Sequence, residues 1–234
     1  MQIEQPTAPG LLDLVRKTLG APLGPGQAGV MMSRAGIGKT ACLTHVALDH
    51  LLRGHTVAHA CIGDIPEKVK VWYHELLKGV FPSPSGTEAA REHHRIEPQR
   101  FIMSFLQQTF QPAKLEQNLQ SLREQTRFRP SMLIVDGLDF DRVERPTMEA
   151  LKDIALRNEA CLWMSARTHR HISTVNEHGV PYPCNEIDDL FDAILLLDAV
   201  PEAIQVKALK KDGQYVSRGP EALLHPDTYL LIER

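Results

Sequence analysis

Hydrophobic positions along the chain follow two spacings, one typical of helices and one typical of strands. Apolar residues three or four apart predict helices, and short continuous apolar runs predict strands covered on both sides. The helices predicted in this way span residues 11–19, 40–53, 66–77, 112–129 and 146–158. The predicted strands span residues 28–33, 56–62, 101–105, 131–136 and 160–165.

The order of these segments predicts the fold class. Strand-like and helix-like segments alternate from residue 10 to residue 198, and three late strands are expected at residues 193–197, 203–209 and 228–232. Alternation followed by a run of strands predicts an α/β fold whose mostly parallel, doubly wound sheet continues into antiparallel C-terminal strands. We expect residues 1–234 to form one domain. Residues 82–100 have a mixed, polar composition that predicts a mobile surface connection.

Composition narrows the class of protein. The chain has 43% hydrophobic and 24% charged residues, which is typical of soluble globular proteins. Its formal charge of −3 argues against a strongly basic nucleic-acid binder. We find neither a secretory signal nor the roughly 20 apolar residues that cross a bilayer. The four cysteines are scattered and form no CxxC pair, so we expect reduced thiols in a cytoplasmic protein.

The most specific motif is SRAGIGKT at residues 33–40, between a predicted strand and a predicted helix. It matches the phosphate-binding pattern G-x-x-x-x-G-K-[ST], except that Ser33 replaces the first glycine. Gly36 and Gly38 allow the backbone N–H groups to converge on a phosphate, and the helix N-terminus adds its positive end. The alternative is a glycine-containing turn before a helix. The predicted nucleotide-binding residues are Ser33, Arg34, Ala35, Gly36, Ile37, Gly38, Lys39, Thr40 and Ala41.

A second acidic element completes the predicted site. Lys39 would neutralise the β- and γ-phosphates, and the hydroxyl of Thr40 would bind Mg²⁺. Asp136 ends the apolar run LIVD and would hold the same ion from the other side. Alternatively, Asp136 only caps the turn DGLDF that follows.

Several of these segments resemble the RecA-like P-loop ATPases, especially the KaiC-type proteins and the ATPase domain of DnaB-type helicases. The resemblance lies in PGLLDLVRKTLGAPLGPGQAGVMMSRAGIGKTACL, LIVDG at 133–137, WMSA at 163–166 and VKALKKDG at 206–213. It implies a RecA-like fold, ATP and Mg²⁺ as ligands, and hydrolysis of the γ-phosphate.

The resemblance also implies roles for residues outside the loop. Ser165 matches a polar residue that senses the γ-phosphate. Lys210 and Lys211 fall near basic residues that reach into a neighbour's site in ring-forming relatives, which implies a homo-oligomer, either a ring or a dimer. The alternative for both lysines is a solvated strand end.

One departure from the resemblance concerns hydrolysis. RecA-like ATPases usually place a glutamate after the second strand, whereas this chain has CIGDIPEK at residues 61–68, with Gly63 or Asp64 at that position. Asp64 and Glu67 are the candidate bases. Loss of a base slows hydrolysis by roughly 10²- to 10⁴-fold, so we expect binding with slow turnover.

Three functions follow from this reasoning. The first is a slow Mg²⁺-dependent ATPase, and the second is a nucleotide-gated switch that binds a protein partner and hardly hydrolyses. The third is a helicase-like, DNA-associated ATPase, with a modest basic patch at residues 167–171. A solvated active-site flap is the alternative for that patch. His169, His171, His178 and Cys184 follow no standard zinc spacing, so we expect a loop there instead of a metal site.

Overall fold

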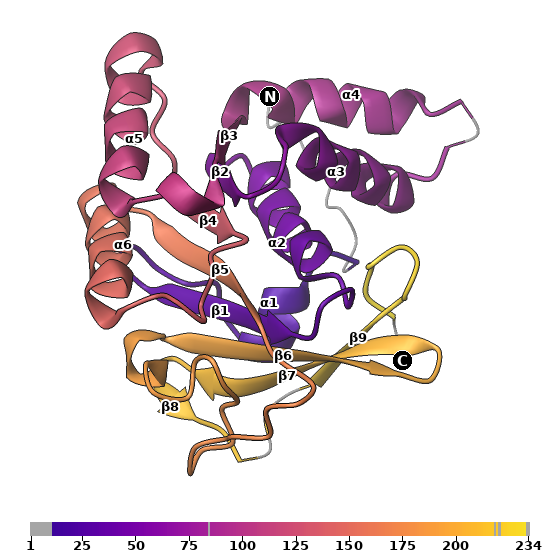
Figure 1. Ribbon diagram of the computed structural model, residues 1–234. Coiled ribbons are helices and arrows are strands. Elements are labelled where there is room, and N and C mark those ends of the chain that lie inside the picture. Colours follow the sequence, from indigo (N-terminus) through magenta and orange to yellow (C-terminus); the bar gives the residue numbers. More distant parts are fainter. Residues whose placement is uncertain (1–10, 84, 218, 220, 233–234) are drawn as a thin grey trace.

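The computed structural model describes residues 11–83, 85–217, 219 and 221–232. Within them, a central sheet of nine strands is covered by helices on both faces (Figure 1). Its strands are β1 (Ala28–Ser33), β2 (Val57–Ile62), β3 (Arg100–Phe105), β4 (Met132–Asp136), β5 (Cys161–Arg167), β6 (Ala193–Val200), β7 (Ala203–Lys211), β8 (Gln214–Tyr215) and β9 (Glu221–Leu224).

The strand order is β3-β2-β4-β5-β1-β6-β7-β8, with β9 paired to β7. All neighbours from β3 to β6 run parallel. The hairpin of β6 and β7 is antiparallel, as are the pairs that β7 makes with β8 and β9. The fold is therefore α/β, with a mostly parallel sheet and antiparallel C-terminal strands, as the sequence predicts at this level.

The helices lie on the two faces of this sheet. They are α1 (Leu14–Leu19), α2 (Lys39–Leu52), α3 (Pro66–Val80), α4 (Thr87–Ile96), α5 (Pro112–Thr126) and α6 (Arg145–Arg157). Figure 1 shows α2, α3 and α4 on one side and α5 and α6 on the other. Alternate residues of the parallel strands enter two separate hydrophobic clusters, one under each layer of helices. The central strands are therefore buried on both faces, which explains their continuous apolar sequences.

The order of the central strands brings distant segments together at one edge of the sheet. β5 lies between β1 and β4, with Val30 and Val135 both opposite Met164. Because these strands are parallel, their carboxyl ends face the same side. Ligands of open α/β sheets bind outside this edge.

The prediction of a mobile connection at residues 82–100 is wrong. Residues 87–96 form helix α4, a short 3₁₀ turn follows at residues 97–99, and β3 begins directly afterwards. The helix buries only Ala89, Glu92 and Ile96, because most of its surface faces solvent. Only two apolar residues of this helix, Ala89 and Ile96, are buried, and the third buried position is a glutamate that is ion-paired with Arg95.

The C-terminal prediction is correct in part. A strand predicted at 228–232 is not formed: that segment makes an isolated bridge between Leu231 and Leu224, and the strand β9 lies earlier, at residues 221–224. The four cysteines are free and buried, as expected. In the part of the chain that the structure describes, no helix has the length and apolar character required to cross a membrane.

Candidate functional site

The SRAGIGKT segment forms a loop that joins the end of β1 to the start of α2. Gly36 and Gly38 have φ angles of +81° and +102°, in the region that favours glycine. Helix α2 begins at Lys39, and its first turn contains no acidic side chain and no side-chain cap. The first backbone N–H groups of a helix have no acceptor within it, so this 14-residue helix presents free donors and its positive end beside the loop.

Lys39 lies across the loop. Its Nζ donates to the carbonyl oxygens of Ser33 and Arg34 at 3.1 and 3.2 Å. Partial burial lowers its pKa, and the nearby carboxylate of Asp136 opposes that effect. The lysine is therefore a partly desolvated cation held by neutral groups, namely the carbonyls of Ser33 and Arg34 and the hydroxyl of Ser33.

Asp136 is the point at which three structural elements meet. Its Oδ2 accepts a hydrogen bond from the hydroxyl of Thr40 at 2.6 Å, and its Oδ1 accepts one from the hydroxyl of Ser165 at 2.5 Å. The Oγ of Ser165 in turn accepts from the backbone N–H of Gly137 at 3.1 Å. The side chains come from the start of α2, the end of β4 and β5, and both Asp136 and Ser165 are buried. The sequence therefore predicted three residues that do converge.

These residues open onto a cleft of about 400 Å³. One wall is the SRAGIGKT loop and the start of α2, and the other is the turn that follows β4. The cleft holds cationic groups from Lys39 and Arg167 beside three aspartates. Its lining residues are Ala35, Lys39, Thr40, Gln107, Asp136, Gly137, Leu138, Asp139, Phe140, Asp141, Ser165 and Arg167.

The other predicted loop residues provide its frame. Ser33 is buried, and its carbonyl oxygen also accepts from the N–H of Thr168. Arg34 is exposed, Ile37 packs against the core under α2, and Ala41 is fully buried. The structure thus brings Lys39, Thr40, Asp136 and Ser165 together, with the loop backbone at their side.

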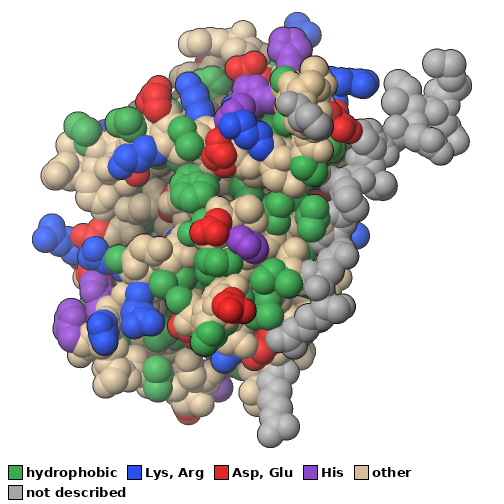
Figure 2. Space-filling model, turned by 90° about the vertical axis from the view of Figure 1, so that its right-hand side faces the viewer, with side chains coloured by type: hydrophobic (Ala, Val, Ile, Leu, Met, Phe, Trp, Pro, Cys, Tyr) green, Lys and Arg blue, Asp and Glu red, His purple; other side chains and the backbone are tan. Residues whose placement is uncertain are grey.

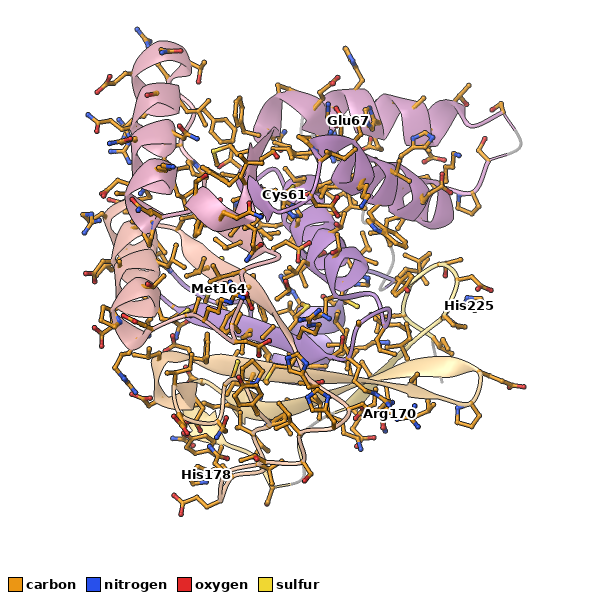
Figure 3. All side chains as sticks on the ribbon, viewed as in Figure 1. Cys61, Glu67, Met164, Arg170, His178 and His225 are labelled. Carbon is orange, nitrogen blue, oxygen red and sulfur yellow. The ribbon has the colours of Figure 1, made fainter. Side chains whose placement is uncertain are left out.

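Asp64 and Glu67, the predicted candidate bases, do not line this cleft. Asp64 caps its own turn by accepting from the N–H of Ile65, and it forms an ion pair with Lys68 at 2.8 Å. Glu67 is 67% exposed and lies 3.9 Å from Lys70. Figure 3 shows Glu67 at the beginning of α3, near α4. Neither carboxylate is thus positioned towards the loop in this structure.

Gln107 was not anticipated from the sequence. It follows β3, at the edge of the sheet, and still reaches the cleft. In the amide orientation that satisfies both neighbours, its Nε2 donates to the carbonyl of Gly137 at 3.0 Å and its Oε1 accepts from the N–H of Asp139 at 3.1 Å. No local sequence pattern predicts this contact of Gln107 with Gly137 and Asp139, because the residues are about 30 positions apart in the chain.

Tyr229 is a second residue that the sequence did not reveal. A Cβ atom added to Gly38 would lie 2.0 Å from the ring of Tyr229, so the ring packs directly on the loop glycine. The carbonyl of Tyr229 also bonds to Nδ1 of His45 on α2, at 2.9 Å. The C-terminal segment is therefore part of the support of the loop.

The two late lysines have different environments. Lys210 is 4% exposed, donates to the carbonyl of Asp188 at 2.9 Å, and lies over the ring of Tyr215. Burial lowers its pKa. Lys211 lies against Gly20 at the end of α1. In this structure Lys210 makes its contacts within its own chain, and a role of either lysine in a neighbour's site stays a prediction.

The loop after β5 is partly folded into the core. Val180 and Cys184 are fully buried. His178 stacks on Tyr215 with ring centres 3.6 Å apart, and His169 bonds to Asp141 at 2.8 Å. Figure 3 shows Arg170 and His178 at separate places along the loop. Among the described residues, no three His, Cys, Asp or Glu side chains form a metal-binding group.

The surface shown in Figure 2 carries basic, acidic and hydrophobic side chains, and Lys, Arg and His side chains gather at its lower left. A continuous basic stripe, which tracks a nucleic-acid backbone, does not run across this face.

No model of a known protein family matches the chain, and no curated protein matches it.

Proposed function

We propose that the protein binds ATP with Mg²⁺ as a member of the RecA-like class and hydrolyses it slowly. The observation that carries the proposal is the convergence on Asp136. A hydroxyl from the start of α2 and a hydroxyl from β5 both donate to this carboxylate, beside a glycine-containing loop and its lysine. The two alternatives of a simple glycine turn and a turn-capping aspartate explain neither contact.

The donor set fits the ion. Mg²⁺ prefers oxygen ligands and is usually bound through one or two carboxylates together with substrate phosphates. Thr40 Oγ1 and Asp136 Oδ2 are both oxygen donors and lie 2.6 Å apart, at the mouth of the loop. When bound, Mg²⁺ would neutralise charge on the phosphates.

The residues of the chain have separable tasks in this proposal. The backbone N–H groups of residues 36–41 and the positive end of α2 hold the phosphates. Lys39 exchanges its carbonyl contacts for phosphate oxygens, which are stronger acceptors because they are charged. The hydroxyl of Ser165 lies between Asp136 and the turn after β4, where a polar group can contact the γ-phosphate, as the resemblance implies.

A second function is favoured by a specific observation. Gly63 offers no side chain, and the carboxylates of Asp64 and Glu67 lie outside the cleft. A protein that binds ATP without positioning a base retains the nucleotide, which is the behaviour of a switch that a protein partner reads.

Calorimetric titration with Mg-ATP, combined with phosphate release, tests the proposal. The wild-type protein is expected to bind ATP, to bind more weakly in EDTA, and to release phosphate slowly. Lys39→Ala removes the cation, whereas Lys70→Ala removes an exposed lysine of α3 and serves as the matched control. If the wild-type protein binds ATP but releases no more phosphate than Lys39→Ala, the result favours the nucleotide-gated switch over the slow ATPase. Equal affinities for wild-type protein and Lys39→Ala would refute nucleotide binding at this loop.

A further inference from the structure

Gln107 occupies the side of the cleft at which the sequence offered no suitable carboxylate. It follows the edge strand β3, two strands away from β4, yet its side chain contacts the turn after Asp136. A side chain crossing that distance must pass over the end of β2, which lies between β3 and β4. Two glycines leave room for the side chain of Gln107 to do so.

Gly63 is the first of these glycines. Its N–H donates to the carbonyl of Phe105, which ties the end of β2 to the end of β3. A Cβ atom at Gly63 would lie 3.1 Å from the terminal atom of the Gln107 amide that is Nε2 in this orientation. The absent side chain at the position expected for a glutamate therefore leaves the space through which the glutamine extends.

Gly137 is the second glycine. A Cβ atom there would lie 2.3 Å from the carbonyl oxygen of Ile62, so only glycine allows the turn after Asp136 to approach the end of β2 so closely. This approach brings the carbonyl of Gly137 and the N–H of Asp139 within reach of the amide of Gln107.

The amide of Gln107 retains hydrogen-bonding capacity. A carboxamide has two N–H donors and two acceptor lone pairs. Gly137 and Asp139 take one of each. The remaining donor and acceptor belong to a side chain that lines the same cleft as Lys39, Thr40 and Asp136.

We infer that Gln107 orients the water that attacks the γ-phosphate, in place of the glutamate that the sequence lacks; this rests on the proposed ATPase function. The amide accepts one hydrogen bond from the water and donates one N–H to the γ-phosphate or to the water oxygen. It is not basic enough to remove the proton, so the proton leaves to the phosphate or to solvent as the bond from water oxygen to phosphorus forms and the bond from phosphorus to the bridging oxygen breaks. A group that orients water without accepting its proton gives slow hydrolysis.

The test separates turnover from binding. Gln107→Ala is expected to lower kcat at least about tenfold, because loss of orientation at a reacting atom typically has effects of that size or larger. The Kd for a non-hydrolysable Mg-ATP analogue is expected to stay within about twofold, because the phosphate contacts through Lys39 and Thr40 are unchanged. Gln108→Ala, an exposed glutamine next in the chain, is the matched control.

A second pair of variants keeps the test independent of folding. Gly63→Ala displaces the amide of Gln107 and is expected to lower kcat in the wild-type background, with little further loss when added to Gln107→Ala. Gly54→Ala has a similar positive φ and no neighbouring atom within 4 Å, so it reports the backbone strain alone.

Three outcomes overturn the inference. One is an unchanged kcat in Gln107→Ala, and another is an equal change in Kd and kcat, which indicates that Gln107 only braces the turn after Asp136. The third is a greater loss of kcat in Asp64→Asn than in Gln107→Ala. In each case the proposed ATPase function stands if the wild-type protein still binds and hydrolyses Mg-ATP, whereas loss of binding in the wild type refutes the proposed function itself.

Discussion

The hydroxyl of Ser165 donates a hydrogen bond to Oδ1 of Asp136 from β5, the strand that lies between β1 and β4. The opposite oxygen of the same carboxylate accepts from Thr40. The start of α2, the end of β4 and the strand β5 are consequently linked through one side chain. A change at any of these three residues is expected to affect both the local stability and the proposed metal site.

Ser165→Ala is expected to destabilise the protein by about 1–3 kcal/mol, because Asp136 loses a donor and the N–H of Gly137 loses its acceptor in a buried place. For a chain of this size, that corresponds to a fall in Tm of roughly 2–12 °C. Thermal unfolding followed by circular dichroism measures it. Ser104→Ala removes an exposed serine from β3 and is expected to change Tm by less than about 2 °C. Equal effects in both variants would contradict a structural role for the hydroxyl of Ser165.

Thr40→Val is expected to remove most of the Mg²⁺-dependent part of ATP affinity, because valine keeps the shape of threonine and lacks its hydroxyl. Thr40→Ser keeps the hydroxyl and is expected to retain that part. The measurement is the ratio of Kd values for ATP in EDTA and in Mg²⁺, for each variant. A ratio in Thr40→Val that equals the ratio in the wild type would show that the hydroxyl does not bind the ion.

Gly38→Ala is expected to cost at least about 2 kcal/mol, because alanine is strained at a φ of +102° and its Cβ would overlap the ring of Tyr229. Gly36 also has a positive φ, but no atom lies within 4 Å of a Cβ added there, so Gly36→Ala should lower the free energy of unfolding by less. Chemical denaturation gives both values. In the Tyr229→Ala background the cost of Gly38→Ala should shrink, and a strictly additive double variant would contradict direct contact between the two residues.

Stability is expected to fall as the pH decreases from about 6.5 to about 4, partly through His50. Burial, assisted by the neighbouring His55, lowers the pKa of His50 to about 4, and its Nε2 lies 2.8 Å from the hydroxyl of Ser131. The unfolded chain takes up a proton at His50 near pH 6.5, whereas the folded chain takes it up only near pH 4. The contribution of the neutral histidine to the free energy of unfolding is therefore complete above pH 6.5 and is lost towards pH 4. Its size is of the order of 2–3 kcal/mol.

Denaturation at several pH values, compared with His50→Gln, isolates this contribution. The variant should show a flatter dependence between pH 6.5 and pH 4, because glutamine does not titrate. His94→Gln, an exposed histidine of α4, is the control and should leave the slope unchanged. An identical slope in wild type and His50→Gln would contradict the assignment.

The sequence predicted those parts of the site that depend on local patterns. A buried parallel strand is a continuous apolar run, and the SRAGIGKT loop joins such a strand to a helix, so Lys39 and Thr40 were found from their neighbours alone. Asp136 was found because it ends such a strand, whereas Ser165 was found through the resemblance, from its place near the end of the next strand.

The remaining parts depend on contacts between distant segments. Gln107 reaches the cleft only because Gly63 and Gly137 bring three strand ends close together, and no pattern around residue 107 encodes this. The same holds for the ring of Tyr229 on Gly38, which lies 191 residues earlier (229 − 38). Helix α4 was missed because its buried face includes a glutamate, ion-paired with Arg95, where an apolar residue is expected.

The contact between Gly38 and Tyr229 continues outwards to an indole ring. Trp72 lies edge-on to Tyr229, with ring centres 5.2 Å apart, whereas the other tryptophan, Trp163, is buried against Gly29 of β1. The chain contains only these two tryptophans. A movement of the loop at Gly38 that displaces Tyr229 is therefore expected to change the surroundings of Trp72 and its fluorescence, without any added label.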